Sequence, residues 1–334
     1  MNIAMAHSNF SFAGGVERYV LEVTRRLATR HRVTLYTSKY LPAATYPGLS
    51  EWPITIIPEW KWATTRLKED VIFTHNHAPN LLAYANKRVG YFAHSFMSDS
   101  ATARPDIALR RLLDRGAMKR NQRILANSKF TAARFHALYH RPATDVVYGG
   151  IDPLFFNMAP RTGDYALYAG RFDPTKGLDR LVDWWQSIDY DLVMIGSGDP
   201  AYIRSLQRYH NPRVTILEPR YDEELVKVYQ NCRFFVFLPF AETLGLVALE
   251  AMAASKPIIG ANAGALKETI LHDTTGILIN SEEEFRRAVH HLITSDQACQ
   301  CMGAAARQHV QQFTWDNITR HIEQISQEMV NAQV

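Results

Sequence analysis

Short hydrophobic runs alternate with longer stretches of helical periodicity along almost the whole chain. Apolar runs of this length, each followed by an amphipathic stretch, are typical of parallel β-sheets covered by helices. In the first half they predict strands at 2–6, 33–37, 71–74, 90–94, 124–126 and 145–148. In the second half they predict strands at 165–170, 191–196, 214–217, 234–238 and 257–261.

The two sets of strands predict two doubly wound α/β units of Rossmann-like type that follow one another. A length of 334 residues also fits about two domains. The segment 149–153 contains two glycines and a proline, which permit a bend, so we place the boundary between 1–150 and 151–314. Open parallel sheets bind ligands beyond the carboxyl ends of their strands, and we expect a ligand site in a cleft where the two units face each other.

The composition, with 47% hydrophobic and 21% charged residues, is that of an ordinary globular protein. It excludes a disordered chain, a collagen-like chain and a small disulfide scaffold. No apolar segment approaches the roughly 18 residues of a membrane-spanning helix, and the amino terminus lacks a basic stretch before an apolar run, so we expect a cytoplasmic protein. Cys232, Cys299 and Cys301 match no metal or redox spacing, and we expect buried thiols.

The charge is distributed unevenly between the two halves. Residues 1–150 hold 21 Lys and Arg against 10 Asp and Glu, whereas residues 151–334 hold 16 against 23. The first half is therefore strongly basic and the second half acidic. This asymmetry suggests that the first half faces an anionic partner, such as a membrane surface, a phosphorylated acceptor or a nucleic acid.

Much of the basic excess falls within residues 104–134. Arg111, Arg115, Lys119 and Arg123 recur every four residues and predict a basic stripe on one helix face. The opposite face would hold Ile107, Leu109, Leu112, Leu113, Ala117 and Met118. The stripe is either a solvated face or a surface for the inner face of the cell membrane or a lipid-linked acceptor. We do not expect nucleic-acid binding, because aromatic residues do not interleave with the charges.

Two segments at predicted strand ends have the composition of phosphate sites. Gly14 and Gly15 open a helix, where small residues let a phosphate approach free backbone N–H groups. The segment 170–177 (GRFDPTKG) carries Arg171 and Lys176, a planar fork and a point charge that can converge on one diphosphate. Taken alone, each segment is equally compatible with an ordinary turn.

The segment 196–201 (GSGDPA) matches the dinucleotide-binding pattern G-x-G-x-x-A. Glu218 closes the next predicted strand about 20 residues further on, as that fingerprint requires. The pattern therefore supports an alternative function, an NAD-dependent oxidoreductase. Against this alternative, such a fingerprint normally opens its domain, whereas Gly196 follows the second predicted strand of its half.

The segment 237–252 combines a strand end, a loop and the start of an apolar helix. Glu242 lies in the loop and Glu250 lies eight residues later, slightly more than two helical turns, so the two carboxylates can lie on similar faces. One carboxylate could accept sugar hydroxyls and the other a ribose, with phosphates at the helix amino terminus between them. Because Glu250 lies among apolar residues, its carboxylate needs a partner.

Together these segments resemble glycosyltransferase family 4, retaining enzymes of the two-Rossmann GT-B architecture. The matching residues are 14–20 (GGVERYV), 149–152 (GGID), 170–177, 196–198 and, above all, 242–269 (ETLGLVALEAMAASKPIIGANAGALKET). The resemblance implies a nucleotide-sugar donor in the cleft, retention of the anomeric configuration, and no cofactor or required metal. It also implies that a last helix, at about 315–331, packs back on the first unit.

The resemblance assigns roles by position. His94 would be the active-site histidine beside the transferred sugar, and it joins Arg171, Lys176 and Glu242 in the expected catalytic set. The expected donor-binding residues are Gly14, Gly15, Gly170, Arg171, Lys176, Gly196, Arg220, Glu242, Thr243, Leu244, Gly245 and Glu250. An alternative hypothesis is that His75, His77 and His94 bind a metal together, but their spacing matches no metal motif. Asp189 and Asp191 have the spacing of an Asp-x-Asp metal site. They precede a predicted strand, however, so their carboxylates would point away from the carboxyl ends of the strands, where the ligand is expected.

The resemblance implies transfer of a hexose-type sugar to a hydroxyl of a glycan, glycolipid or lipid-linked acceptor, as in polysaccharide biosynthesis. A UDP-sugar is the favoured donor and GDP-mannose the next. Ser255 and Ala265 stand where the family usually has glycine, and 217–220 replaces a glycine-containing turn near the nucleotide base, so the base and sugar stay open. The alternatives are the oxidoreductase and a non-catalytic nucleotide-sugar-binding protein of the same fold.

Overall fold

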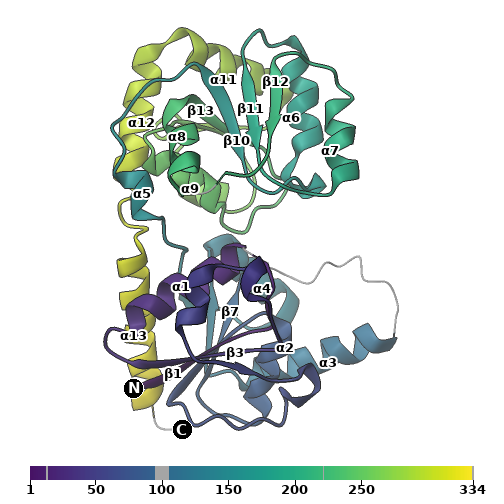
Figure 1. Cartoon of the computed structure of the whole chain (residues 1–334), viewed down its shortest axis with the longest axis vertical. Helices are drawn as coiled ribbons and strands as arrows, with labels where there is room; N and C mark the ends of the chain where they lie inside the picture. The colour runs from purple at the N-terminus through teal and green to yellow at the C-terminus, as the bar shows by residue number, and fades with distance from the viewer. Residues whose placement is uncertain (13, 95–104, 221, 333–334) are drawn as a thin grey trace. The chain divides into compact units, whose positions relative to one another are not determined.

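The computed structural model describes residues 1–12, 14–94, 105–220 and 222–332 of the chain. They form two compact units, one made of Met1–Gly150 with Trp315–Val334 and the other of Ile151–Thr314 (Figure 1). Each unit is a parallel β-sheet with helices packed against it. The predicted α/β class with two Rossmann-like units is therefore confirmed.

The sheet of the first unit has the strand order β5-β3-β1-β6-β7-β8-β9. Its strands are β1 Asn2–His7, β3 Arg32–Thr37, β5 Ile54–Ile56, β6 Val71–His75, β7 Val89–Ala93, β8 Arg123–Ala126 and β9 Asp145–Val146. A separate parallel pair consists of β2 (Asn9–Phe10) and β4 (Lys39–Tyr40). The strand order reverses at β1 and β6, where His7 lies opposite His75 in the register. Sheets of this kind bind ligands at such a reversal, beyond the carboxyl ends of the strands.

Helices cover both faces of this first sheet. Successive side chains of a strand point to opposite faces, and β1 shows the alternation. Ile3 and Met5 belong to an apolar cluster with α1 (Gly15–Leu27) and the last helix of the chain. Ala4 and Ala6 belong to a second cluster on the other face. The remaining helical segments are α2 His77–Asn80, α3 Pro105–Arg120, α4 Lys129–Tyr139, η1 Pro42–Ala44, η2 Pro47–Glu51, η3 Glu59–Lys61 and η4 Leu81–Tyr84.

The last helix, α13 (Trp315–Asn331), belongs to the first unit and runs beside α1 (Figure 1). Its apolar face is buried in the same cluster as α1 and β1. Trp315 covers the backbone at Gly150, where an added Cβ would lie only 2.3 Å from the indole. Gly150 is therefore required by this close approach of the helix.

The acidic residues of α13 pair with arginines of the first half. Asp316 lies 2.7 Å from Arg26, and Glu328 lies 2.9 Å from Arg123. Glu323 lies 2.8 Å from Arg30. Part of the basic excess of residues 1–150 is thus compensated inside the unit by the end of the chain.

The predicted basic stripe is not a continuous helix face. Helix α3 ends at Arg120, so Arg123 lies in β8 and its guanidinium contacts Glu328. Arg115 and Lys119 are exposed on α3, whereas the side chain of Arg111 is outside the described residues. The predicted apolar face is also wrong in part. Ala117 and Met118 are buried, but Leu109, Leu112 and Leu113 are exposed by 58%, 67% and 37%.

The second unit has a parallel sheet in the order β12-β11-β10-β13-β14-β15. Its strands are β10 Tyr165–Ala169, β11 Leu192–Ile195, β12 Val214–Leu217, β13 Cys232–Phe237, β14 Ile258–Ala261 and β15 Gly276–Ile279. Its helical segments are α5 Pro153–Phe156, η5 Pro174–Lys176, α6 Leu178–Trp184, η6 Trp185–Ser187, α7 Pro200–Gln207, α8 Asp222–Asn231, α9 Leu246–Ala253, α10 Leu266–Thr269, α11 Glu282–Thr294 and α12 Asp296–Val310.

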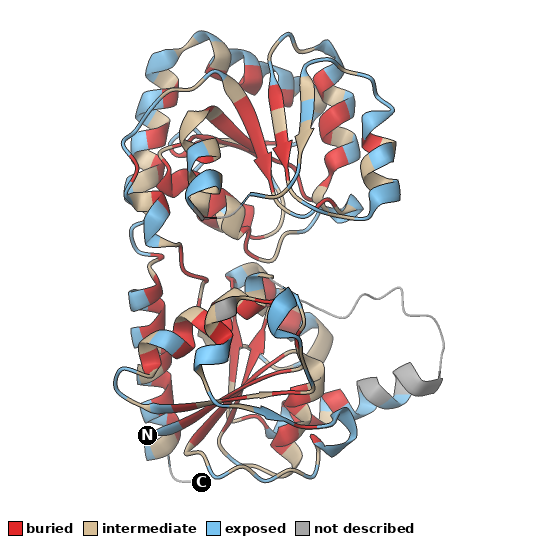
Figure 2. Ribbon diagram, viewed as in Figure 1, coloured by how far each residue is buried: buried red, intermediate tan, exposed pale blue. Residues whose placement is uncertain are grey.

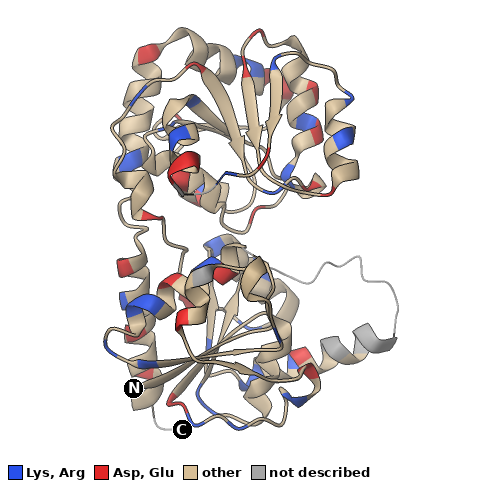
Figure 3. Cartoon of the chain, viewed as in Figure 1, with Lys and Arg blue, Asp and Glu red and all other residues tan. Residues whose placement is uncertain are grey.

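The apolar pattern of the chain corresponds to the burial of its strands. Figure 2 shows the strands of each sheet mostly buried and the outer faces of the helices exposed. Central strands such as β1, β6, β10 and β14 carry no Lys, Arg, Asp or Glu (Figure 3). Among the helices that the structure describes, none has the length and apolar character needed to cross a bilayer.

The expectation for the cysteines is right for two thiols and wrong for the third. Cys232 and Cys299 are buried, whereas Cys301 is exposed. Residues two apart on a helix point about 200° apart, so on α12 the burial of Cys299 turns Cys301 outward.

Candidate active site

The carboxyl end of β10 leads into the segment that carries Arg171. Tyr168 donates its hydroxyl hydrogen to the Arg171 carbonyl at 2.8 Å, which fixes the backbone there. The Arg171 guanidinium is 69% exposed and lies 3.5 Å from Asp173. Burial acts to raise the pKa of Asp173, but hydrogen bonds from the hydroxyl and amide of Thr175 outweigh it and hold the pKa below its usual value. The strand end therefore presents an exposed cation beside an ionised carboxylate.

Lys176 and Glu242 are joined directly, although 66 residues separate them in the chain. The Lys176 ammonium lies 2.6 Å from Glu242 Oε2. The two side chains are only 22% and 11% exposed. Gly177 follows with φ +71°, and a Cβ there would lie 2.0 Å from the Leu238 carbonyl oxygen. Glycine thus lets the Lys176 segment pack against the end of β13.

The Glu242 loop is held by the segment that follows β14. The Glu242 carbonyl accepts a hydrogen bond from the Ala265 amide at 2.9 Å. Gly264 adopts φ +58°, and a Cβ there would lie 2.4 Å from the same carbonyl oxygen. The carboxylate also accepts a bond from the Thr243 amide at 3.1 Å through Oε1. Glu242 is therefore fixed by both its backbone and its side chain.

Helix α9 begins beside this carboxylate. Gly245 occupies the N-cap position with φ +82°. A Cβ added there would lie 3.3 Å from Glu242 Cγ. The first amides of a helix and its dipole favour an anion at this end. Glu250 lies in the second turn, where the buried Tyr229 hydroxyl lies 3.4 Å from its carboxylate. Tyr229 thus provides the hydrogen-bond partner that a carboxylate among apolar residues needs.

The glycines of the segment 196–201 have a packing role. A Cβ on Gly196 would lie 1.8 Å from the Gly170 carbonyl oxygen, and a Cβ on Gly198 would lie 2.2 Å from the Phe172 carbonyl oxygen. Asp199 caps α7 by accepting a bond from the Ala201 amide at 2.6 Å. Close approach of the Arg171 segment explains the glycine spacing, which removes the main support for a dinucleotide fingerprint.

Two other sets of predicted residues form ion pairs with partners other than Lys176 and Glu242. Arg220 is half exposed, and its guanidinium lies 3.9 Å from Glu224. Asp189 and Asp191 both pair with Arg213, at 2.6 Å and 3.1 Å, before the start of β11. The two aspartates of the Asp-x-Asp segment therefore belong to a surface ion-pair cluster at the amino end of a strand.

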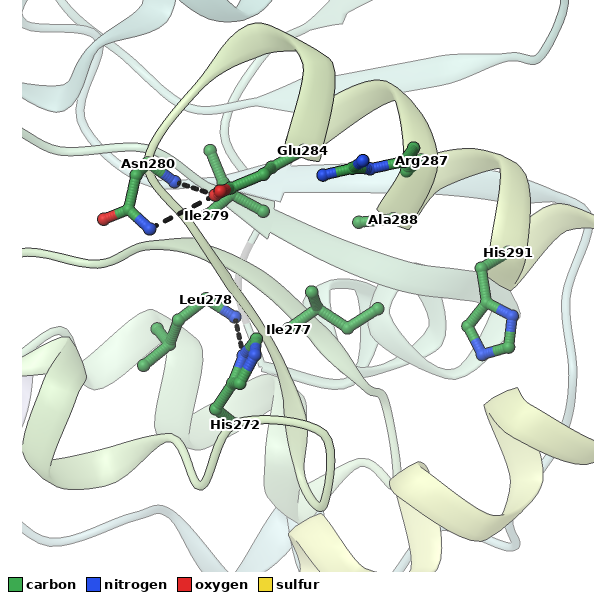
Figure 4. A pocket seen from close by; sticks show the side chains of 9 residues that line it. All are labelled: His272, Ile277, Leu278, Ile279, Asn280, Glu284, Arg287, Ala288 and His291. Atoms are coloured by element: carbon green, nitrogen blue, oxygen red, sulfur yellow. Dashed lines mark hydrogen bonds between the residues drawn. The ribbon is translucent and has the colours of Figure 1, made fainter.

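A hollow of about 360 Å³ lies elsewhere in the second unit, along β15 and α11 (Figure 4). Its lining includes His272, Glu284 and Arg287. Glu284 accepts hydrogen bonds from the amide and side chain of Asn280, so its carboxylate is committed to the start of α11. None of the predicted donor-binding residues lines this hollow.

In the first unit, the predicted glycine pair opens α1. Gly14 is the N-cap residue, and Gly15 is the first residue of the helix. A Cβ on Gly14 would lie 2.6 Å from the carboxylate of Glu17. Glu17 is buried and lies 2.7 Å from His7 Nε2. This buried hydrogen-bonded pair was not predicted, although Glu17 stands directly after the two glycines and Val16 in the sequence.

His94 follows β7 and lies in a group of rings. Its Nε2 is 2.8 Å from Nδ1 of the buried His75, and the ring of Tyr19 meets it edge-on at 5.1 Å. Burial, followed by the charge of His7, lowers the pKa of His94 to about 3. His94 is therefore neutral near pH 7. His75 was considered only as a possible metal ligand and Tyr19 was not predicted as a site residue, since only the fold shows how they contact His94.

The third histidine of the metal cluster that the sequence analysis considered, His77, has a different partner. His77 Nδ1 lies 3.0 Å from Asp114, a buried carboxylate that also accepts a bond from Tyr139 at 2.6 Å. Within the described ranges, no group of three or more His, Cys, Asp or Glu is arranged to hold a metal ion.

Two family models together match most of the chain. The model described as Glycosyltransferase Family 4 matches residues 13–154, and the model described as Glycosyl transferases group 1 matches residues 155–309. The boundary between the matches lies four residues from the boundary between the two structural units. The two models thus correspond closely to the two units.

Curated relatives carry glycosyltransferase names. An uncharacterized glycosyltransferase of Methanocaldococcus jannaschii is 25% identical over 55% of this chain and 53% of its own length. A D-inositol 3-phosphate glycosyltransferase of Corynebacterium diphtheriae is 34% identical over 41% of this chain and 35% of its own length. The matches thus span about half and one third of these two relatives. The Stackebrandtia nassauensis protein of the latter name is 26% identical over 91% of this chain and 84% of its own.

Solved structures share the fold over the whole chain. Anabaena HepE, solved in complex with UDP and glucose, has a TM-score of 0.82 and 17% identity, with 98% of this chain and 99% of that chain covered. Sucrose-phosphate synthase of Thermosynechococcus elongatus has a TM-score of 0.81 and 20% identity, with 100% of both chains covered. The chain therefore belongs to glycosyltransferase family 4 and has the two-unit GT-B fold.

Proposed function

We propose that the protein is a retaining, metal-independent hexosyltransferase, whose second unit binds a nucleotide-sugar donor and whose first unit receives the acceptor. The observation that carries the proposal is the 2.6 Å contact between Lys176 and Glu242 beside the amino end of α9. One small region of the second unit thereby combines a cation, a carboxylate and a helix amino terminus. These are the groups that a diphosphate linked to a sugar needs.

The diphosphate would be bound by Lys176, by Arg171 and by the first amides of α9. In the reaction, the bond between sugar C1 and the diphosphate oxygen breaks, so negative charge builds on the departing phosphate. Fixed cations and N–H donors aimed at that charge lower the barrier more than contacts that act equally before the reaction. This charge stabilisation is the work for which other transferases use a metal, and Lys176 and Arg171 supply it here.

Glu242 would accept hydroxyl groups of the transferred sugar, and Glu250 would accept the ribose hydroxyls. Glu242 is suited to this role because the Ala265 and Thr243 amides fix it while its Oε2 contacts Lys176. The same carboxylate then links the sugar to the cation that holds the phosphate. In a retaining reaction of this family, the acceptor oxygen attacks C1 on the face that the phosphate leaves, and the acceptor proton passes to the departing phosphate oxygen.

A UDP-sugar is the first donor candidate and GDP-mannose the second. The support for UDP is structural likeness to HepE, whose solved complexes contain UDP, UDP with glucose, or UDP-glucose. The acceptor would be a hydroxyl of a glycan, glycolipid or lipid-linked sugar. The residues predicted from the family, His94 among them, keep their assigned roles in this proposal.

An anionic membrane surface is the proposed docking partner of α3. Leu109 and Leu112 are more than half exposed, and Arg115 and Lys119 are exposed on the same helix. Exposed leucines next to cations fit the interface of an anionic bilayer, where the apolar side chains enter the headgroup region and the cations remain at its surface. This docking would bring a lipid-linked acceptor to the first unit.

A calorimetric titration with UDP-, GDP- and ADP-sugars tests the proposed donor class. We expect one nucleotide class to bind and the affinity to fall in Lys176→Ala. Binding of NAD with no binding of any nucleotide sugar would support the oxidoreductase alternative instead. Nucleotide-sugar binding without turnover, even with a broad set of acceptors, would support a non-catalytic binding protein.

A further inference from the structure

His75 and His94 form a hydrogen-bonded pair on neighbouring strands of the first unit. His75 is the last residue of β6, and His94 directly follows β7. The His75 Nδ1 and His94 Nε2 atoms are 2.8 Å apart. His75 is fully buried, and His94 is half-buried as a whole residue.

Aromatic side chains hold both imidazoles in place. The His75 ring stacks on Phe92 at 5.1 Å with an interplanar angle of 8°. Tyr19 of α1 meets the His94 ring edge-on, and Trp315 of α13 in turn packs on Tyr19 at 5.8 Å. Because the rings are packed from several elements, the line between the two nitrogens is fixed by the core of the unit.

The burial of the pair decides which nitrogen carries the hydrogen. Burial is the largest cause that lowers the pKa of both rings, so both are neutral near pH 7. Two neutral imidazoles can share one hydrogen bond in two ways. His75 Nε2 is buried and has no hydrogen-bond partner among the described residues. A hydrogen on that nitrogen would be an unpaired buried donor, which is costly, so the hydrogen of His75 lies on Nδ1.

We propose that His75 is a positioning residue that donates from Nδ1 to His94 Nε2 and thereby fixes His94 as its Nδ1–H tautomer. His94 then offers a hydrogen-bond donor, and not a base, to an oxygen of the bound sugar. The inference rests on the proposed function at one point, the place of His94 beside the sugar. The tautomer itself follows from the fold alone.

Other titratable groups face the pair and also act on its charge. His7 of β1 lowers the pKa of both His75 and His94, and Glu17 of α1 lies 2.7 Å from His7. Burial raises the pKa of Tyr19 well above its ordinary value, so its hydroxyl stays protonated. The pH dependence of activity therefore reports on the whole group, and the tautomer of His94 is the more specific readout.

Three substitutions at position 75 separate hydrogen bonding from packing. Asn places its amide nitrogen where the histidine has Nδ1, so His75→Asn keeps the donor to His94. His75→Gln carries the same amide one bond further out, and His75→Leu has no donor. A bond accepted by the neutral form of a group opposes its protonation, so loss of the donor should raise the pKa of His94. The Gln and Asn variants are matched controls, because they differ in the position of one functional group.

The test is nitrogen NMR of the full chain with labelled histidine, in which the two ring nitrogens report the tautomer. We expect His94 to be Nδ1–H in the wild type and in His75→Asn, and to lose this preference in His75→Gln and His75→Leu. For transfer, we expect a kcat loss of about 10- to 100-fold in Gln and Leu, the usual effect of removing a supporting partner, with little change in donor KM. His75→Asn should retain most of the activity.

An Nε2–H tautomer of His94 in the wild type would overturn the proposal. Equal kcat losses in the Asn and Leu variants would also overturn it, since packing alone would then explain the effect. A fully active His94→Phe variant, which has no ring donor, would instead refute the proposed place of His94 beside the sugar. The wild-type spectrum is recorded without substrate and without any substitution. Failure of the tautomer proposal can therefore be distinguished from failure of the proposed place of His94 beside the sugar.

Discussion

The Lys176 ammonium lies 2.6 Å from Glu242 Oε2, which joins the residue predicted to hold the donor phosphate to the residue predicted to hold its sugar. Both residues come from loops at the carboxyl ends of strands, after β10 and β13, which are neighbours in the sheet. In the proposed mechanism, the donor would bridge the two groups. Because of this contact, the effect of substituting one of the two residues on kcat/KM should depend on whether the other is present.

Removal of either diphosphate cation should reduce catalysis strongly. We expect Arg171→Ala and Lys176→Ala to lower kcat/KM by about 30- to 1,000-fold, roughly 2 to 4 kcal/mol, the usual effect of losing one preorganised electrostatic donor. The measurement is steady-state transfer with the identified donor. Arg213→Ala is the matched control, because this exposed arginine pairs with Asp189 and Asp191 and should leave transfer unchanged. Wild-type kcat/KM in either cation variant would refute its assigned role.

A double-mutant cycle should reveal the coupling of the two residues. Lys176→Ala leaves the partly buried Glu242 carboxylate without its cation, so part of its effect is unrelated to the donor. We expect the combined Lys176→Ala and Glu242→Gln variant to be less impaired than the sum of the two single effects, because contacting residues are not additive. Strict additivity in kcat/KM would mean that the 2.6 Å contact does not matter for the reaction.

The two carboxylates should differ in what they bind. Glu242→Gln should damage sugar transfer far more than affinity for free nucleotide diphosphate. Glu250→Gln should weaken nucleotide affinity by about 10- to 100-fold, as expected for loss of a charged hydrogen-bond acceptor. Calorimetric titration of both variants with the nucleotide diphosphate distinguishes them, and each serves as the control for the other. If the two affinities fall equally, the sugar and ribose roles are wrongly divided.

The buried histidine pair should make the fold sensitive to acid. The pKa of His94 is about 3 in the folded chain, against 6.5 for an ordinary histidine. Below pH 6.5 the His94 imidazole binds a proton in the unfolded chain but not in the folded chain, and this binding favours unfolding. The free energy of unfolding is therefore highest above pH 6.5 and falls as the pH is lowered toward 3. His75 acts in the same direction.

Urea unfolding at several pH values measures this effect. We expect the midpoint to fall between pH 7.5 and pH 5, and to fall less in His94→Phe. The control is His290→Asn, because His290 is exposed on α11. A decline with pH that is the same in His94→Phe and in the wild type would assign the acid sensitivity to other groups.

The surface of α3 should bind anionic bilayers. Each lysine or arginine near such a surface contributes roughly 1 kcal/mol, and screening over about 8 Å at physiological salt makes the attraction salt-dependent. We expect co-sedimentation with vesicles that contain anionic lipid, and its loss when Leu109, Leu112, Arg115 and Lys119 are all changed to Gln. The control changes the exposed Arg286 and Arg287 of α11 to Gln. Equal pelleting of all three proteins would leave α3 as a solvated helix.

The apolar pattern predicts the central strands well because buried strands of a parallel sheet are continuous hydrophobic runs. Every predicted strand is present, with bounds within two residues. The pattern missed β5 and β15, at the edges of the two sheets, and the separate pair of β2 and β4. Each of these strands has four residues or fewer, and so short a run carries a weak hydrophobic signal. The helical spacing from Arg111 to Arg123 misled us, because periodicity does not mark where α3 ends and β8 begins.

For the site, the sequence could locate single loops but not the contacts between them. Lys176 and Glu242 each lie at a predicted strand end, yet their contact depends on β10 and β13 being neighbours, which chain order does not indicate. Gly196 and Gly198 fit the spacing of a dinucleotide motif, and only the positions of Gly170 and Phe172 in the fold reveal their packing role. The partnership of His75 with His94 likewise arises from the pairing of β6 with β7.

Transfer chemistry itself is the central claim, and NMR of the complete reaction tests it most directly. The protein is incubated in excess EDTA with UDP-glucose, UDP-galactose or GDP-mannose and with pooled acceptors that include simple sugars and inositol 3-phosphate. Phosphorus spectra follow the release of nucleotide diphosphate, and proton spectra give the configuration of the new glycosidic bond. We predict that one donor is consumed, that the product keeps the α configuration of that donor, and that Lys176→Ala is nearly inactive. A product of inverted configuration, or transfer that requires added magnesium or manganese, would contradict the account.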